Sequence, residues 1–123
     1  MSKDYVSKEL AKKLQEKGYP LKKVYRQDEA PLFYDLPQDH PHWSQCDAWY
    51  LPSIWDALKW LRKEKKIHVE IDIMKAYPEA KLTYWGYNIV LIDKYEVCHF
   101  ERNSNSCEQA ALAGIEYVID NLI

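Results

Sequence analysis

The sequence predicts an α+β fold: a three-stranded antiparallel meander with two helices packed on one face, plus an N-terminal helix and an irregular arm. Three observations support this fold class. Apolar residues recur at helical spacing after Pro52 and again near the C-terminus, residues 67–73 alternate between apolar and polar, and residues 82–92 are apolar on both parities. This order of elements favours a single sheet that carries both main helices on one side.

The length of 123 residues is that of one domain, with an N-terminal helix and Pro-rich arm in residues 1–52 and a helix–meander–helix core in residues 53–123. The net charge of −2 hides charge blocks. Residues 1–26 hold eight Lys/Arg against three acids, and residues 59–66 hold five bases against one acid. Such blocks can pair with each other or present faces of opposite charge to a partner. The isoelectric point near 6.1 argues against a strongly basic nucleic-acid binder.

Membrane and export signals are missing from the sequence. No basic leader precedes an apolar run, and no apolar run approaches the roughly 18 residues that span a bilayer. We therefore expect a cytoplasmic protein without a membrane segment. Its three cysteines, Cys46, Cys98 and Cys107, are then expected as free thiols, and no cofactor is predicted.

The N-terminal segment predicts a short helix with Ser7 as N-cap and Gly18 at its C-terminal stop. Leu10 and Leu14 mark a thin buried face, so this helix must dock on another part of the chain. In the arm that follows, proline is frequent, and we expect short strands around Leu21–Arg26 and Leu32–Leu36. The arm is too rich in aromatic and leucine residues to be a free tail.

The clearest local signal is the stretch from Ser53 to Ile73. Ser53 with Asp56 is a variant of the capping box, and a wide apolar face follows at helical spacing. Cations crowd the last turn, where the helix dipole favours them. The alternation from Ile67 to Ile73 then predicts a strand that is buried on one side.

Residues 82–92 predict the central strand of the meander, with Gly86 as a bulge. Asp93-Lys94 is expected to turn the chain into a third strand, Tyr95–Phe100. The second face of this sheet would carry Tyr84, Val90 and Ile92, which either the arm or a second copy of the chain must cover.

The C-terminal helix is expected after the turn residues Asn103–Ser106, with Ser106 and Gln109 as a second capping box. Gly114 lies inside this helix, where glycine costs up to about 1 kcal/mol relative to alanine. A close approach to the sheet or to the helix that begins at Ser53 explains it. One face of the helix carries Cys107, Ala110, Ala111, Gly114, Ile115, Val118 and Leu122.

The stretch Leu51–Val69, LPSIWDALKWLRKEKKIHV, resembles a group of small uncharacterised proteins common in phages and prophages of gut bacteria. Those proteins pair a similar helix with an Ile-His-Ile/Val strand, an aromatic-rich hairpin and an Ala-rich final helix. The matching parts here include Tyr84–Ile92 and Glu108–Ile123, so the resemblance spans roughly residues 51–123. It implies this fold and a phage or mobile-element origin, and it carries over no catalytic or binding residue.

Aromatic side chains near a basic cluster suggest a stacking platform for single-stranded nucleic acid, since this chemistry combines aromatic rings with Lys/Arg. The alternative is that most of the rings are core residues. The acidic blocks on either side weaken the attraction for a polyanion. The predicted platform consists of Tyr84, Trp85, Tyr87, Tyr95, Arg62, Lys65 and Lys66.

A second hypothesis is a zinc site in the loop 39–47, where His40, His42, Cys46 and Asp47 offer nitrogen, sulfur and oxygen ligands. In this site His40, His42 and Cys46 would be three of the ligands, and either Asp47 or Cys107 would be the fourth. The spacing matches no zinc-finger or HExxH pattern, so a polar loop with scattered histidines is the simpler explanation.

Enzymatic activity is not favoured. Cys98 and His99 are neighbours on a predicted strand and therefore point to opposite faces. His68 is a conceivable partner across the sheet, and Glu70 and Asp72 would share its face. No set of nucleophile, base and orienting group follows from the spacing. The function ranked first is a non-catalytic protein-interaction module that binds a protein partner or self-associates as a homodimer, with nucleic-acid binding and zinc binding as alternatives.

Overall fold

The computed structural model describes residues 5–22, 32–34, 39, 41–42, 48–75 and 83–123. The chain divides into two compact units, Met1–Ser53 and Ile54–Ile123. This division lies one residue from the boundary expected between the arm and the core. Within the described ranges, no helix is long and apolar enough to cross a membrane.

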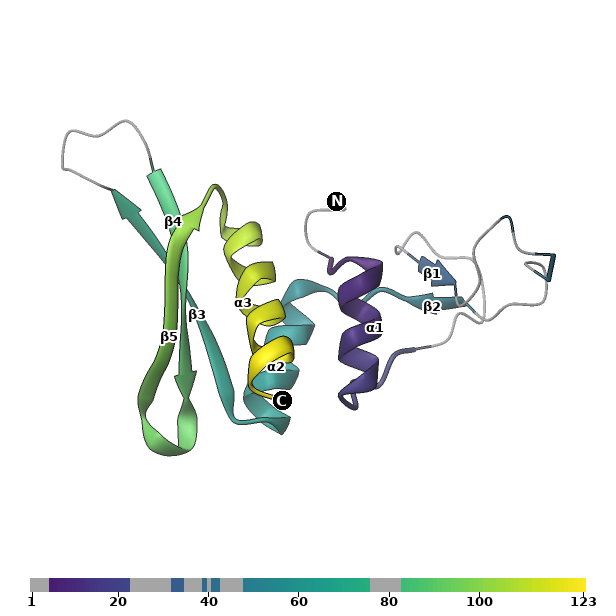
Figure 1. The fold of residues 1–123 in the computed structure, drawn as a ribbon, viewed down its shortest axis with the longest axis horizontal. Helices are drawn as coiled ribbons and strands as arrows, with labels where there is room; N and C mark the ends of the chain where they lie inside the picture. Colours follow the sequence, from purple (N-terminus) through teal and green to yellow (C-terminus); the bar gives the residue numbers. More distant parts are fainter. Residues whose placement is uncertain (1–4, 23–31, 35–38, 40, 43–47, 76–82) are drawn as a thin grey trace. The chain divides into compact units, whose positions relative to one another are not determined.

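The described residues of the first unit form helix α1 and a small sheet (Figure 1). Helix α1, Lys8–Glu16, begins where the Ser7 hydroxyl accepts a hydrogen bond from the Leu10 amide at 3.1 Å. Gly18 follows the helix with a φ of 104°, so both predicted ends are confirmed. Its buried side includes Leu10 and Leu14.

Two short strands of the arm pair in antiparallel fashion, β1 Leu32–Tyr34 with β2 Ala48–Tyr50. Residues 32–34 confirm the start of the strand expected at Leu32–Leu36. The strand expected at Leu21–Arg26 is wrong over its described part, since Leu21 and Lys22 lie outside any strand. Lys22 instead accepts a single backbone bond from Tyr50 at 2.9 Å. The remainder of both predictions lies outside the described residues.

The second unit is the predicted helix–meander–helix core. Its sheet has the order β3-β4-β5, with both neighbouring pairs antiparallel. The central position of β4 and the α+β class are therefore confirmed. The elements are α2 Ile54–Glu64, β3 Ile67–Lys75, β4 Thr83–Leu91, the 3₁₀ turn η3 Ile92–Lys94, β5 Glu96–Ser104 and α3 Cys107–Asn121.

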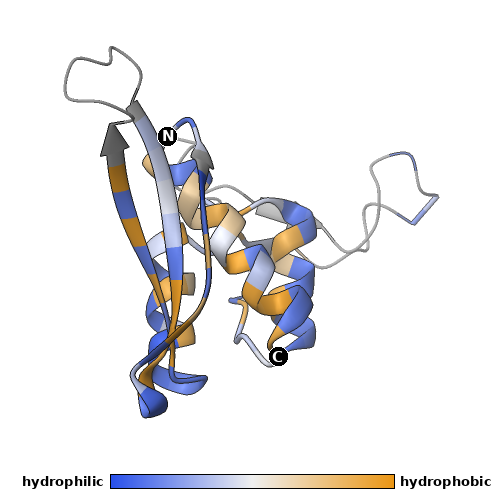
Figure 2. Ribbon diagram, turned by 60° about the vertical axis from the view of Figure 1, so that its left-hand side comes forward, coloured by the Kyte–Doolittle hydropathy of each residue, from blue (hydrophilic) through white to orange (hydrophobic). Residues whose placement is uncertain are grey.

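Helices α2 and α3 pack on the same face of this sheet, as Figure 1 shows. Apolar and polar residues alternate along β3 (Figure 2), and the apolar set faces the helices. Gly114 allows the closest approach, because a Cβ there would lie 2.5 Å from Val69 Cγ1 and 3.3 Å from the Tyr87 ring. The expected close approach is therefore to the sheet. The core of the unit consists of Ile54, Ala57, Leu58, Leu61, Ile67, Val69, Tyr87, Ile89, Ala110, Ala111, Ile115, Val118 and Ile119.

Strand β5 is longer than expected. It runs to Ser104, whereas Asn103–Ser106 had been predicted as a turn. Two register shifts explain the difference: one lies opposite Gly86, where the extra residue belongs to β5 and not, as expected, to the strand of Gly86, and the other lies between Ile89 and Val90. Each shift lets β5 use one more residue than β4, so the pairing extends further along the chain.

The start of α3 agrees with the predicted capping box. The Ser106 hydroxyl accepts a hydrogen bond from the Gln109 amide at 3.1 Å, and the Gln109 side chain accepts one from the Asn105 amide, also at 3.1 Å. The return bond thus reaches the residue before the cap.

Candidate functional site

One face of the three-stranded sheet is turned away from α2 and α3, and we call it the open face. The strand register arranges its side chains in rows, because residues that are paired across antiparallel strands point to the same side. His68, Val90 and Val97 form one row and Glu70, Asn88 and Phe100 the next, while Asp72, Gly86 and Arg102 form the third.

Large apolar side chains are exposed along β5 and the turn before it. Tyr95 is 92% exposed, Val97 56% and Phe100 59%. Among the described residues only two other large hydrophobic side chains are exposed, Trp55 on α2 and Ile73 on β3. Exposed apolar residues are therefore concentrated on one edge strand of the sheet, a position that proteins usually protect.

Polar groups of the open face are held by specific contacts. The Asn88 Nδ2 donates to Asp72 Oδ2 at 2.6 Å, which ties β4 to β3. The Arg102 guanidinium lies 5.1 Å from the centre of the Phe100 ring, within the range of a cation–π interaction. Gly86, which has no side chain, lies between Asp72 and Arg102 in the third row. A Cβ at residue 86 would collide with the backbone of β5.

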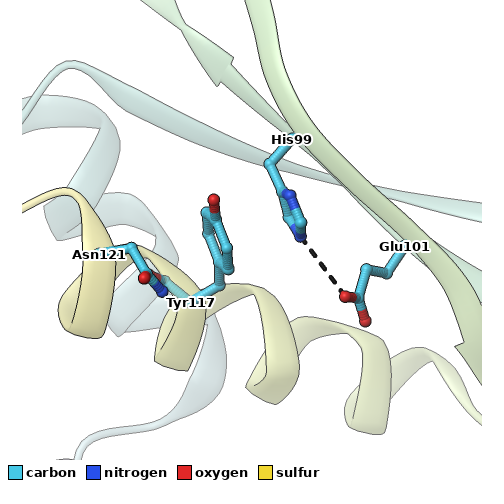
Figure 3. Close-up of polar contacts among 4 residues, drawn as sticks. All are labelled: His99, Glu101, Tyr117 and Asn121. Carbon is cyan, nitrogen blue, oxygen red and sulfur yellow. Dashed lines mark hydrogen bonds and ion pairs between the residues drawn. The ribbon is translucent and has the colours of Figure 1, made fainter.

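On the helix-facing side, His99 of β5 belongs to a cluster of rings and charges (Figure 3). Its ring stacks on that of Tyr117 of α3, with centroids 3.7 Å apart and an interplanar angle of 2°. Its Nε2 is buried and lies 3.6 Å from Glu101 Oε1, an ion-pair distance that is too long for a hydrogen bond. The Tyr87 ring centre is 5.9 Å from that of His99.

This cluster joins β5 to α3. Burial raises the pKa of Tyr87 to about 12, with smaller contributions from the charges of Glu101 and Tyr117. No local pattern predicts the stacking, since His99 and Tyr117 meet only because antiparallel pairing with Ile89 turns His99 toward the helices. The rings pack against one another, and the described residues around them include no nucleophile poised next to a base.

The residues considered for catalysis lie on different sides of the sheet. His99 faces α3, whereas His68 lies on the open face with Glu70 and Asp72, as expected. Cys98 is exposed. The His68 and His99 side chains therefore cannot meet across the sheet, and Cys98, the nucleophile of the hypothesis, lies at a register shift where no residue of β4 is paired with it.

The residues of the predicted stacking platform lie in three places. Tyr84 is on the open face, whereas Trp85 and Tyr87 face the helices, and Tyr87 is only 4% exposed. Tyr95 lies at the other end of β4, in a left-handed conformation with a φ of 51°. Tyr84 and Leu91 are seven residue steps apart along the strand, which is roughly 23 Å.

The basic residues of that platform lie at the same end of the sheet as Tyr95. Arg62 and Lys65 are exposed at the end of α2, and the Lys66 carbonyl accepts a hydrogen bond from the Ile92 amide at 3.0 Å. Lys65 Nζ lies 5.4 Å from the Trp60 ring centre. The structure thus brings Tyr95 and the cations to one end of the sheet, and Tyr84 and Trp85 to the other.

The zinc hypothesis falls mostly outside the described residues, since His40, Cys46 and Asp47 are not among them. His42 is exposed. Cys107 lies at the start of α3, where burial, and to a smaller extent Glu108, raise the pKa of its thiol and disfavour the thiolate that binds metal. Among the residues that the structure describes, no three His, Cys, Asp or Glu side chains form a metal-binding group.

Comparisons of the chain with protein-family models, with curated proteins and with solved structures found no match.

Proposed function

We propose that this protein is a non-catalytic protein-interaction module whose contact surface is the open face together with β5 and the turn residue Tyr95 before it. The observation that carries the proposal is the concentration of exposed apolar side chains at Tyr95, Val97 and Phe100. Burying such side chains against a partner contributes roughly 25 cal/mol per Å² of apolar surface, so this strand gains most from a contact. Aromatic residues and arginine are also the types that dominate protein interfaces.

A substitution at Phe100 tests this function. Phe100→Glu places a charge among the exposed apolar side chains of β5, and since the side chain is exposed the fold should be retained. Trp55→Glu is the matched control, because Trp55 is an exposed aromatic residue of comparable exposure on α2. Circular dichroism would first confirm that both variants fold.

The three immobilised proteins are then compared by affinity capture from cells that express the chain, followed by mass spectrometry. We expect the wild-type and Trp55→Glu proteins to capture the same partner and Phe100→Glu to lose it. A second copy of the chain counts as such a partner. Identical captured sets for all three proteins would overturn the proposal.

The origin of the protein is a separate proposal. The resemblance over residues 51–123 supports a role in a phage or other mobile element. Expression of the chain after induction of a prophage, measured by mass spectrometry, would test it; constitutive expression independent of induction would argue against it.

A further inference from the structure

The open face carries opposite charges at its two edges. On β3 the acidic side chains Glu70 and Asp72 belong to two successive rows. On β5 the same two rows hold Phe100 and Arg102. Within one chain Asp72 and Arg102 are two strand spacings apart, roughly 10 Å between Cα atoms. The central strand between them contributes Asn88, Val90 and the side-chain-free Gly86.

Of the two in-plane two-fold axes that run along or across the strands, only the one along the strands brings opposite charges together. An axis parallel to β4 places β5 of one copy over β3 of the other and keeps the rows at the same level. Arg102 then faces Asp72 twice, and the Arg102–Phe100 pair lies beside Glu70. An axis that runs across the strands instead stacks β3 on β3, which sets acid against acid and is unfavourable.

We propose that the partner of the open face is a second copy of this chain, related by a two-fold axis parallel to β4, with reciprocal Arg102–Asp72 contacts. This inference rests on the proposed function and names its partner. Val90 and Asn88 lie nearest the axis, so the centre of the interface is small and partly apolar. Isologous contacts of this type, in which the same patch is used by both copies, are the commonest in homodimers.

The area of the open face sets the strength of this dimer. Three strands spaced about 4.8 Å apart and rows spaced about 7 Å apart cover roughly 300 Å² on each copy. Stable interfaces bury about 800 Å² on each partner. We therefore expect a weak, reversible dimer with a dissociation constant on the order of 100 µM. Since its contacts include charges, the dimer should weaken as salt rises.

Charge reversal tests the arrangement of the two copies. Arg102→Asp gives a chain with acids at both positions, and Asp72→Arg gives a chain with bases at both, so each variant alone should dimerise at least tenfold more weakly than wild type. A mixture of the two variants restores both opposite-charge contacts and should form a heterodimer. Arg62→Asp, an exposed reversal on α2 away from the open face, is the control and should behave as wild type.

Sedimentation velocity from about 10 µM to about 1 mM, a range around the expected dissociation constant, measures these species. The rescue in the mixture also guards against misfolding, because Asp72→Arg loses its bond from Asn88. Single variants that dimerise as well as wild type, or a mixture that stays monomeric, would overturn the inference.

If the wild-type protein is monomeric but still captures a partner that depends on Phe100, the inference that this partner is a second copy is overturned and the proposed function stands. A monomeric protein whose captured set does not depend on Phe100 would overturn the proposed function as well.

Discussion

At the scale of single residues, Tyr87 shows how burial decides the role of an aromatic side chain. It lies on the central strand, where its ring packs beneath α3 next to Gly114, and its neighbours include Glu101 and Tyr117. Burial and these charges all disfavour the tyrosinate. The side chain that had been expected to stack on a nucleic acid is therefore part of the core.

A pH-dependent stability follows from the pKa of Tyr87. The pKa rises from its ordinary value of 10.0 to about 12 on folding, so the unfolded chain loses this proton more readily than the folded chain does. The stabilisation is present below pH 10 and is lost as the pH rises from 10 to 12. Urea unfolding across this interval should show a steeper loss of stability for wild type than for Tyr87→Phe, which has nothing to ionise there. Equal slopes would contradict this account.

At the scale of secondary-structure elements, the packing of α3 on the sheet depends on the absence of a side chain at Gly114. Glycine in a helix weakens the helix, so its presence must be offset by the contact it permits. A Cβ at this position would come within 2.5 Å of Val69 Cγ1. The helix therefore lies closer to β3 than any other residue would allow.

Substitution of Gly114 by alanine separates helix propensity from packing. Propensity alone would stabilise the protein by up to about 1 kcal/mol, whereas overpacking costs about 1–3 kcal/mol. We expect the packing cost to prevail and Gly114→Ala to lower the free energy of unfolding. In the double variant with Val69→Ala, which removes the colliding methyl group, the loss should be smaller than the sum of the two single losses. If the losses in the free energy of unfolding measured by denaturant titration are additive, the contact with Val69 is not the reason that residue 114 must be glycine.

Elements with a strong local period were predictable from the sequence, and those set by distant contacts were not. The alternation of Ile67–Ile73 and the hydroxyl of Ser106 mark β3 and the start of α3 directly. The length of β5 depends on two register shifts in its pairing with β4, which no local pattern shows in full. The stacking of His99 on Tyr117 likewise arises only when β5 and α3 are brought together.

At the scale of the whole molecule, the second unit presents two different sheet faces. One is covered by α2 and α3, and the other carries exposed Val97 and Phe100 on its edge strand β5. The sequence predicted a second face that needs a cover, because the central strand is apolar on both parities. The sequence could not predict what covers this face, since Asp72 and Arg102 are placed in one row only by the register of the folded sheet.

The central claim is that the open face is where the protein makes contact with its own copy. Amide NMR spectra recorded at increasing protein concentration test it most directly, because each residue reports its own surroundings. The account predicts shifts that grow with concentration at Glu70, Asp72, Asn88, Phe100 and Arg102, with the amides of α2 and α3 unchanged. Concentration-dependent shifts confined to the helices, or spectra that do not change up to about 1 mM, well above the expected dissociation constant, would contradict it.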